Sequence, residues 1–213
     1  KVFITGHTGF KGAWLCIILR NLNSSIYGYA LKPEKNSLFN RSKINKEIIS
    51  NTYSNINNIS KLRKKIQQSK PEIIFHLAAQ PLVLESYKSP LKTFNTNIIG
   101  TLNILECVRE VKSVKSVVII TTDKVYKINK RNINYNELDE LGGDDPYSAS
   151  KVAAETVVKS YTKSFFKNTI LQNRVSTVRA GNVIGGGDYS KNRLLPDIIR
   201  AINNKKIMNI RNP

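Results

Sequence analysis

Three glycines spaced three residues apart follow the first apolar run of the chain. The run is residues 1–5 (KVFIT), and Gly6, Gly9 and Gly12 lead from it into an amphipathic segment at residues 11–21. Glycines between a strand and a helix allow a tight turn, close packing of the helix, and close approach of a pyrophosphate to the backbone amides. The helix start adds partial positive charge. The sequence therefore predicts a strand, turn and helix that bind a nucleotide cofactor.

Short apolar runs alternate with longer amphipathic stretches along the rest of the chain. This alternation is typical of parallel strands joined by crossover helices, and runs of Val, Ile and Leu indicate strands buried on both faces. The predicted strands are residues 1–5, 25–30, 47–51, 73–78, 116–121 and 174–179. The predicted helices are residues 11–21, 59–68, 90–111 and 146–166. We therefore expect an α/β fold with a doubly wound parallel sheet, the Rossmann fold.

The composition favours a folded cytoplasmic protein with a basic surface. The 213 residues are 40% hydrophobic and carry a formal net charge of +19, with no apolar run of membrane-spanning length. The lysines are scattered among many Asn and Ile residues, which favours a solvated surface over a nucleic-acid-binding face. Cys16 and Cys107 lie in apolar helical patterns without CxxC spacing, which argues against a disulfide framework or a zinc site.

A tyrosine and a lysine four residues apart form a second candidate site. Tyr147 and Lys151 of YSASK share one helical face at the start of the helix after the fifth strand. A tyrosine with an ordinary pKa of about 10 is a poor base at neutral pH, but a nearby ammonium and an oxidised nicotinamide both favour the phenolate. Elsewhere such a pair would be coincidence; its position makes it a candidate acid–base pair.

A polar turn follows the fifth predicted strand. It reads Thr121, Thr122, Asp123 and Lys124, and it lies at the carboxyl end of the sheet, where doubly wound folds bind their ligands. An ordinary turn would also be polar. At this edge of the sheet, however, a hydroxyl, a carboxyl and an ammonium are candidates for proton transfer to a bound substrate.

These motifs together resemble the extended short-chain dehydrogenases/reductases. TGHTGFKG departs from the dinucleotide fingerprint GxGxxG and resembles that family's TGxxGxxG, and YSASK resembles its YxxxK. Asp123 followed by Lys124 resembles the 4,6-dehydratases that act on CDP-glucose, whereas the dTDP-glucose type has Asp followed by Glu. Further segments of the same resemblance are HLAAQPLV at 76–83, NTNIIGT at 95–101 and RAGNVIGGGD at 179–188.

The resemblance covers nearly the whole chain and implies a set of site residues. The implied cofactor-binding residues are Gly6, Thr8, Gly9, Phe10, Lys11, Gly12, Asn55, Ile56, Leu77, Ala78, Ala79, Gln80, Asn97, Thr121, Tyr147 and Lys151. The implied substrate-binding residues are Gln80, Thr122, Asn182 and Arg193, and no metal is implied. The cofactor is NAD, with NADP left open because Lys32 follows the second strand in place of an acidic residue. Leu84 stands where the family has an arginine.

The resemblance also implies a reaction, the NAD-dependent dehydration of CDP-glucose to CDP-4-keto-6-deoxyglucose by a hydro-lyase. Its catalytic residues are Thr122, Asp123, Lys124, Tyr147 and Lys151, with Tyr147 as the first base, Asp123 as the acid and Lys124 as the second base. The alternatives are another nucleotide-sugar 4,6-dehydratase, including the UDP-N-acetylglucosamine type, or a 4-epimerase of the same fold. A more remote alternative is a catalytically silent module that binds a cofactor or nucleic acid.

The expected organisation is a cofactor-binding domain at residues 1–180, followed at 181–213 by the beginning of a nucleotide-sugar-binding region. The chain opens directly on a strand and stops at Pro213 without a terminating element, so we expect it to be cut at both ends. The helices at 90–111 and 146–166 offer faces for a homodimer. The expected partners are a nucleotide-sugar substrate and a second copy, with no membrane and no nucleic acid.

Overall fold

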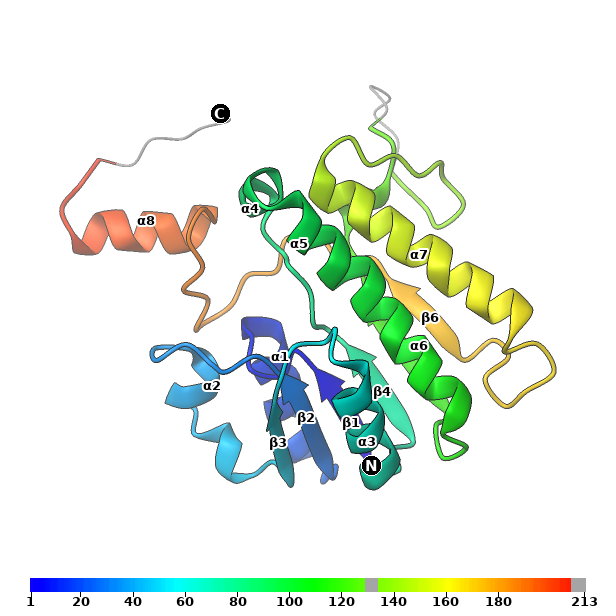
Figure 1. The fold of residues 1–213 in the computed structure, drawn as a ribbon. Helices are drawn as coiled ribbons and strands as arrows, with labels where there is room; N and C mark the ends of the chain where they lie inside the picture. Colours follow the sequence, from blue (N-terminus) through cyan, green and yellow to red (C-terminus); the bar gives the residue numbers. More distant parts are fainter. Residues whose placement is uncertain (129–133, 208–213) are drawn as a thin grey trace.

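A parallel sheet of six strands lies at the centre of the computed structural model, which describes residues 1–128 and 134–207 (Figure 1). The strands are β1 (Val2–Thr5), β2 (Ile26–Ala30), β3 (Ser50–Tyr53), β4 (Ile73–His76), β5 (Ser116–Ile120) and β6 (Val175–Val178). Their order is β3-β2-β1-β4-β5-β6, and every neighbouring pair is parallel. The order reverses between β1 and β4, where sheets of this kind open a ligand crevice at the carboxyl ends of the strands.

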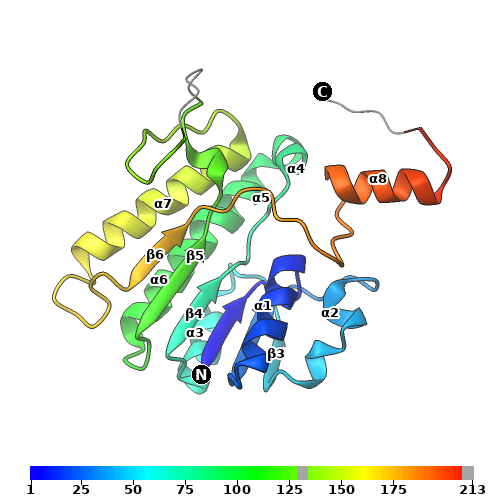
Figure 2. The ribbon, with the colours of Figure 1, turned by 180° about the vertical axis from the view of Figure 1, so that it is seen from behind.

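Helices cover the sheet on both faces (Figures 1 and 2). One face carries α3 (Ile59–Ser69), α6 (Gly100–Glu110) and α7 (Pro146–Ser164), and the other carries α1 (Phe10–Asn21). A π-helical stretch, η2 (Asn95–Ile99), joins α5 (Pro90–Phe94) to α6. The shorter elements are α2 (Leu38–Arg41), η1 (Ile44–Lys46), α4 (Val83–Lys88), η3 (Asp123–Val125) and α8 (Leu194–Asn203).

The apolar core lies in two layers because successive side chains of a strand point to opposite faces. Phe3 packs with Ile104 and Val158 beneath α6 and α7, whereas its neighbour Ile4 packs with Cys16 beneath α1. Each is at most 4% exposed. Full burial of such a side chain contributes about 1.5–3 kcal/mol, so the two layers fix the sheet that carries the candidate site.

The predicted Rossmann sheet and its four long helices are confirmed, with one strand displaced. The third strand, predicted at residues 47–51, lies at Ser50–Tyr53. Ile48 is buried against the α1 layer without joining the ladder, and pairing with β2 begins only where Ser50 meets Tyr27. The apolar residue Ile48 therefore indicated burial in the core just before β3, which is an edge strand of polar residues. The short helices α2, α4 and α8 were not predicted.

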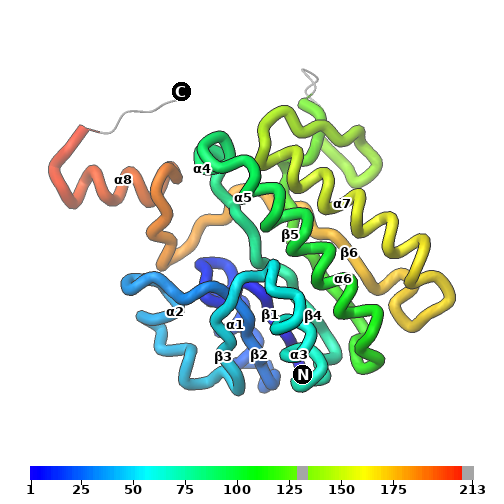
Figure 3. Tube along the Cα trace, viewed as in Figure 1, coloured from blue at the N-terminus to red at the C-terminus, as the bar shows by residue number. Residues whose placement is uncertain are grey.

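The segment after β6 runs across the carboxyl ends of the central strands to α8 (Figure 3). Trp14 Nε1 on α1 donates to the carbonyl of Gly186 at 2.9 Å, and Arg41 on α2 donates to the Tyr189 hydroxyl. These contacts bring residues 181–193 to the glycine turn. The predicted second region thus begins over the mouth of the sheet, and its residues 208–213 lie outside the described part of the chain.

Within residues 1–128 and 134–207, no helix combines the length and the apolar character needed to cross a membrane.

Candidate active site

The glycine turn leaves no room for a side chain at two of its three glycines. Gly6 has a φ of 74°, and a Cβ on it would lie 2.7 Å from the amide nitrogen of Ala78. A Cβ on Gly12 would lie 2.2 Å from the Gly6 carbonyl oxygen, because α1 packs directly on the turn. At Gly9, which precedes α1 without a side-chain cap, the nearest atom would be 3.4 Å away. The uncapped amides at the start of α1 and this shallow cradle fit a pyrophosphate.

We expect Gly12→Ala to disrupt the fold and Gly9→Ala to disrupt only binding. The Cβ of alanine at residue 12 forces the turn off α1, which lowers the free energy of unfolding by about 1–3 kcal/mol. At residue 9 the backbone is extended and the space is open, so stability is retained while the methyl group obstructs a diphosphate. Denaturant unfolding and calorimetric titration with NAD separate the two effects. A Gly9→Ala variant with undiminished NAD affinity would contradict the placement of the diphosphate.

The predicted adenosine side is formed by loops after β2 and β3. Thr8 Oγ1 donates to the carbonyl of Leu31 at 2.9 Å and so ties the glycine turn to the tip of β2. Asn55 is exposed, with its backbone carbonyl accepting from the Tyr29 hydroxyl at 3.1 Å and its Oδ1 accepting from the amide of Asn57 at 3.0 Å. Ile56 is buried. The backbone carbonyl of Asn55 also accepts from the amide of Asn58 at 3.0 Å, so both of its lone pairs are used and only Oδ1 keeps one for a further donor.

The two histidines have structural positions. His76 shares hydrogen bonds with Thr5 (2.7 Å) and Thr101 (3.2 Å), and burial lowers its pKa to about 3. His7 shares one with Asn51 at 3.0 Å, and burial lowers its pKa to about 4. Both rings are therefore neutral at physiological pH. The His7 ring also fills the space where a Cβ on Gly28 would stand.

Asn97 and Gln80 hold the loop after β4. Asn97 Oδ1 accepts from the amide of Gln80 at 2.8 Å, and its Nδ2 donates to the Gln80 carbonyl at 3.1 Å and to Ser150 Oγ at 2.8 Å. The Gln80 amide group donates to Leu82 O and Thr93 Oγ1 and accepts from the amide of Leu82. Both side chains are buried and bonded within the protein, so they fix the loop that carries Leu77, Ala78 and Ala79; their predicted contacts with a cofactor or substrate stay a prediction.

Tyr147 is placed in the first turn of α7 by a helix cap. Asp145 Oδ1 accepts from the amides of Tyr147 (2.9 Å) and Ser148 (3.0 Å), and Pro146 follows the cap. The phenol reaches Thr122 at the end of β5. Burial raises the pKa of Tyr147, while the hydrogen bond with Thr122 and the charge of Arg193 lower it. The expected phenolate is therefore not produced by these residues alone.

Lys151 is buried beneath Tyr147. Its Nζ donates to the carbonyl of Ile120 at 3.1 Å, and its side chain is 7% exposed. Burial, with a smaller contribution from the Lys11 ammonium, lowers the pKa of Lys151 to about 8, against the favourable charge of Glu155. Lys11 is itself affected, because burial and Arg193 lower its pKa. Three cations from α1, α7 and the 181–193 segment thus converge at the mouth of the glycine turn, which favours anionic ligands.

We expect Lys151→Met to stabilise the protein at neutral pH. The ammonium of Lys151 is costly to bury, as its pKa falls from the usual 10.5 to about 8. Between these values the unfolded chain binds more protons than the folded one, so stability rises with pH. Removal of the charge should add about 2 kcal/mol to the free energy of unfolding at pH 7, and the gain should disappear above pH 10.5. Denaturant unfolding at pH 7 to 10.5 tests this, and a loss of stability at pH 7 would contradict it.

Asp123 and Lys124 follow Thr122 and are exposed. Thr122 Oγ1 donates to Asp123 Oδ1 at 3.1 Å and accepts from the Lys124 amide at 3.4 Å. Arg193 donates to Asp188 at 3.0 Å, and Asn182 is exposed in the segment that crosses the mouth. The turn with Asp123 and Lys124 packs against α7, whose first turns carry Tyr147 and Lys151.

Glu155 lies beside this site and belongs to none of the sequence motifs described above. Glu155, one helical turn after Lys151, accepts from Thr121 Oγ1 at 2.7 Å and is paired with Arg179. The sequence signals for this pair are the position of Glu155, four residues after Lys151, and the position of Arg179 at the end of the last predicted strand.

The chain matches the protein family described as GDP-mannose 4,6-dehydratase over residues 3–209. It is 45% identical to the CDP-glucose 4,6-dehydratase of Salmonella typhimurium, covering 100% of this chain and 60% of that protein. It is 33% identical to the dTDP-D-glucose 4,6-dehydratase of Dictyostelium discoideum, covering 97% and 49%. The chain thus spans about half to three fifths of the length of these two relatives.

The fold is shared with solved structures of similar topology. A dTDP-glucose 4,6-dehydratase double mutant from Streptomyces venezuelae, solved with NAD and DAU bound, superposes with a TM-score of 0.83 at 20% identity over 96% of this chain and 62% of that one. A UDP-glucose 4-epimerase from Thermotoga maritima, solved with UDP-glucose, gives 0.82 at 20% identity over 96% and 63%.

Proposed function

Because the chain belongs to the GDP-mannose 4,6-dehydratase family, we propose that it forms the cofactor and acid–base part of a hydro-lyase that converts CDP-glucose to CDP-4-keto-6-deoxyglucose. The observation that carries the proposal is the position of Thr122, which hydrogen-bonds both to the Tyr147 phenol and to the Asp123 carboxylate. A hydroxyl of a bound sugar at this point has a base and an acid within reach. The choice of CDP-glucose is supported by the 45% identity to a CDP-glucose 4,6-dehydratase.

The proposed cofactor is NAD, held by the glycine turn with its nicotinamide near Tyr147. When bound there, NAD would supply the carrier for the hydride that is moved from carbon 4 of the sugar to carbon 6. Its choice is supported by the glycine cradle and by NAD in the solved dehydratase from Streptomyces venezuelae. Lys32 is exposed after β2, where an acidic residue would exclude a ribose phosphate, so NADP is the second candidate.

The chain's own residues move the protons. Tyr147 takes the proton of the hydroxyl on carbon 4 while Thr122 orients that hydroxyl and the Lys151 ammonium favours the phenolate. The resulting ketone acidifies the hydrogen on carbon 5, which Lys124 removes. Asp123 gives its proton to the hydroxyl leaving carbon 6, which departs as water. Lys124 then gives its proton back to carbon 5 as the hydride returns to carbon 6.

We further propose a cytoplasmic homodimer. The outer surfaces of α4, α5 and the following π-helical stretch carry exposed apolar side chains, with Tyr87 62%, Leu91 74% and Ile99 40% exposed. These helices pack beside α7. Apolar side chains grouped in this way favour association with a second copy.

Isotope transfer tests the proposed function on the full-length protein. CDP-glucose deuterated at carbon 4 should give a product that carries the label at carbon 6, because the hydride leaves and returns within one bound sugar. Mass spectrometry of the product locates the deuterium. Turnover of dTDP-, UDP- and GDP-sugars under the same conditions tests the choice of base. Loss of the label to solvent would contradict the scheme, and return of the label to carbon 4 with inverted configuration would favour an epimerase.

A further inference from the structure

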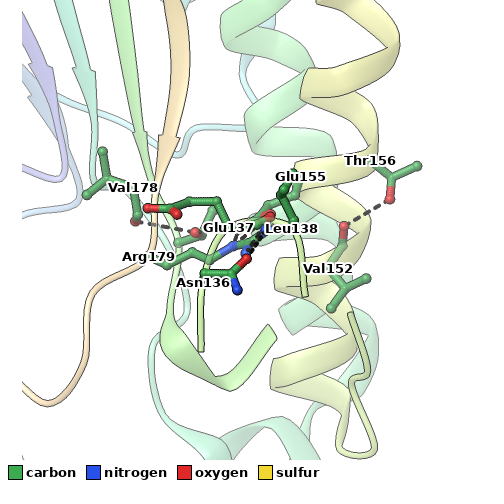
Figure 4. Close-up of polar contacts among 9 residues, drawn as sticks. Asn136, Glu137, Leu138, Val152, Glu155, Thr156, Val178 and Arg179 are labelled. Carbon is green, nitrogen blue, oxygen red and sulfur yellow. Dashed lines mark hydrogen bonds and ion pairs between the residues drawn. The ribbon is translucent and has the colours of Figure 1, made fainter. Parts of the chain in front are cut away.

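An ion pair between the buried Glu155 and the partly buried Arg179 lies behind the turn that carries Asp123. Arg179, directly after β6, donates to Glu155 on α7 through Nε at 3.1 and 3.2 Å and through Nη2 at 2.7 Å. Figure 4 shows the arginine reaching from the end of β6 towards that glutamate. The side chains of Arg179 and Glu155 are 15% and 7% exposed. A pair with two donors and this degree of burial fixes both side chains in one orientation. The proposed chemistry uses neither residue.

The ion pair contacts the catalytic turn, residues 121–126, at both ends. At the start, Thr121 Oγ1 donates to Glu155 Oε1 at 2.7 Å. At the far end, the Arg179 guanidinium lies 4.7 Å from the centre of the Tyr126 ring, within range of a cation–π interaction. Between them, the amide of Asp123 donates to the carbonyl of Ala180 at 3.1 Å. The intervening catalytic residues therefore depend on this pair for their position.

The same glutamate acts on Lys151. The two residues are four positions apart on α7, and the carboxylate favours the ammonium form that burial and Lys11 disfavour. His76 on β4 also faces Lys151, but burial keeps that ring neutral. Lys151 bonds to the carbonyl of Ile120, and Glu155 bonds to the side chain of the next residue. The end of β5 is thus held by two consecutive contacts from α7.

We propose that Glu155 and Arg179 are positioning residues that hold the Thr122–Lys124 turn and the Lys151 ammonium in register for proton transfer at the sugar. The inference rests on the proposed function for the substrate, and on the geometry above for the residues. Neither side chain touches the reacting atoms. Their effect passes through Thr121, Tyr126 and Lys151.

Glu155→Gln in the full-length protein tests the proposal. Glutamine keeps the size of the side chain and an acceptor for Thr121, but it removes the charge that supports Lys151. We expect kcat to fall about tenfold or more with KM for CDP-glucose unchanged, because ground-state binding does not use this pair. The alkaline limb of kcat should move about one unit to lower pH, since Lys151 loses its proton more readily. An unchanged alkaline limb would overturn the proposal.

Two further variants separate positioning from stability. Glu155→Gln alone leaves the partly buried Arg179 charge without its anionic partner, which destabilises the fold. The double variant Glu155→Gln with Arg179→Gln removes both charges and should recover thermal stability while it keeps the displaced alkaline limb. Recovery of kcat and of the limb together with stability would overturn the proposal in favour of a structural role. Glu110→Gln, which breaks a 2.9 Å pair with Arg63 between α3 and α6, is the matched control and should leave the limb in place.

A second measurement needs no substrate. In protein labelled with ¹³C-lysine, the Lys151 signal is identified by its disappearance in Lys151→Met, and its titration midpoint should fall by about one pH unit in Glu155→Gln. An unchanged midpoint would overturn the proposal. If the unmodified protein does not turn over CDP-glucose, the proposed function fails by itself, and this titration still reports on Glu155.

Discussion

Replacement of Tyr147 by phenylalanine in the full-length protein should lower kcat for CDP-glucose dehydration by about 10²–10⁴-fold. The phenol lies at the start of α7, where it reaches Thr122, and no other described tyrosine is placed at this turn by an equivalent cap. Loss of its oxygen removes the proposed acceptor for the carbon 4 proton but leaves the ring in place. KM should change little, because the missing interaction acts in the transition state.

Steady-state kinetics with a matched phenylalanine variant check this assignment. Tyr27 on β2 packs its partly buried ring against the core beneath α3 and α6, so Tyr27→Phe should retain activity. The free energy of unfolding of Tyr147→Phe should stay within about 1 kcal/mol of the unmodified value, since one buried hydrogen bond is lost. A variant that keeps a tenth of the original kcat would refute the role of Tyr147 as the base.

Replacement of Asp123 by asparagine should stop the reaction at a later point. Asparagine keeps an oxygen for the hydroxyl of Thr122, so the turn should be preserved, but it has no proton to give to the leaving hydroxyl. We expect the rate of product formation to fall by about 10²–10⁴-fold while oxidation at carbon 4 still takes place. The bound sugar should then be a 4-ketone that retains its hydroxyl at carbon 6.

Trapping the bound sugar distinguishes this result from a general loss of activity. Rapid quenching with sodium borodeuteride places deuterium on carbon 4 of any ketone, and mass spectrometry shows whether the carbon 6 hydroxyl remains. The exposed Asp144 serves as a control, because Asp144→Asn should leave turnover unchanged. If Asp123→Asn yields only unoxidised CDP-glucose, Asp123 acts earlier than proposed, and its assignment as the acid is wrong.

The sequence predicted the strands and the glycine turn, because both follow from the residue types at neighbouring positions. Apolar runs located five of the six strands closely, and the spacing of Gly6, Gly9 and Gly12 predicted a turn in which Gly6 and Gly12 leave no room for a Cβ. The third strand was displaced because Ile48 is buried by the α1 layer and not by the sheet ladder. Periodicity cannot distinguish these two kinds of burial.

The electrostatic state of the site could not be predicted in the same way. Sequence places Tyr147 and Lys151 on one helical face, but burial acts on both, so the tyrosine pKa is raised and the lysine pKa is lowered. Desolvation depends on what packs around a group and leaves no mark in a motif. The hydrogen bonds of Gln80 and Asn97 to each other were hidden for the same reason, since they join residues 17 positions apart.

The buried ammonium of Lys151 also has a consequence for which residues related chains carry at this position. Under the proposed function, selection retains at this position a cation that is costly to bury. Once the demand for catalysis is relaxed, almost any uncharged replacement is an improvement in stability, so this position should be among the first to change. We expect a paralogue with an apolar residue at the position of Lys151 and an intact glycine turn to bind the nucleotide cofactor but not to catalyse the reaction.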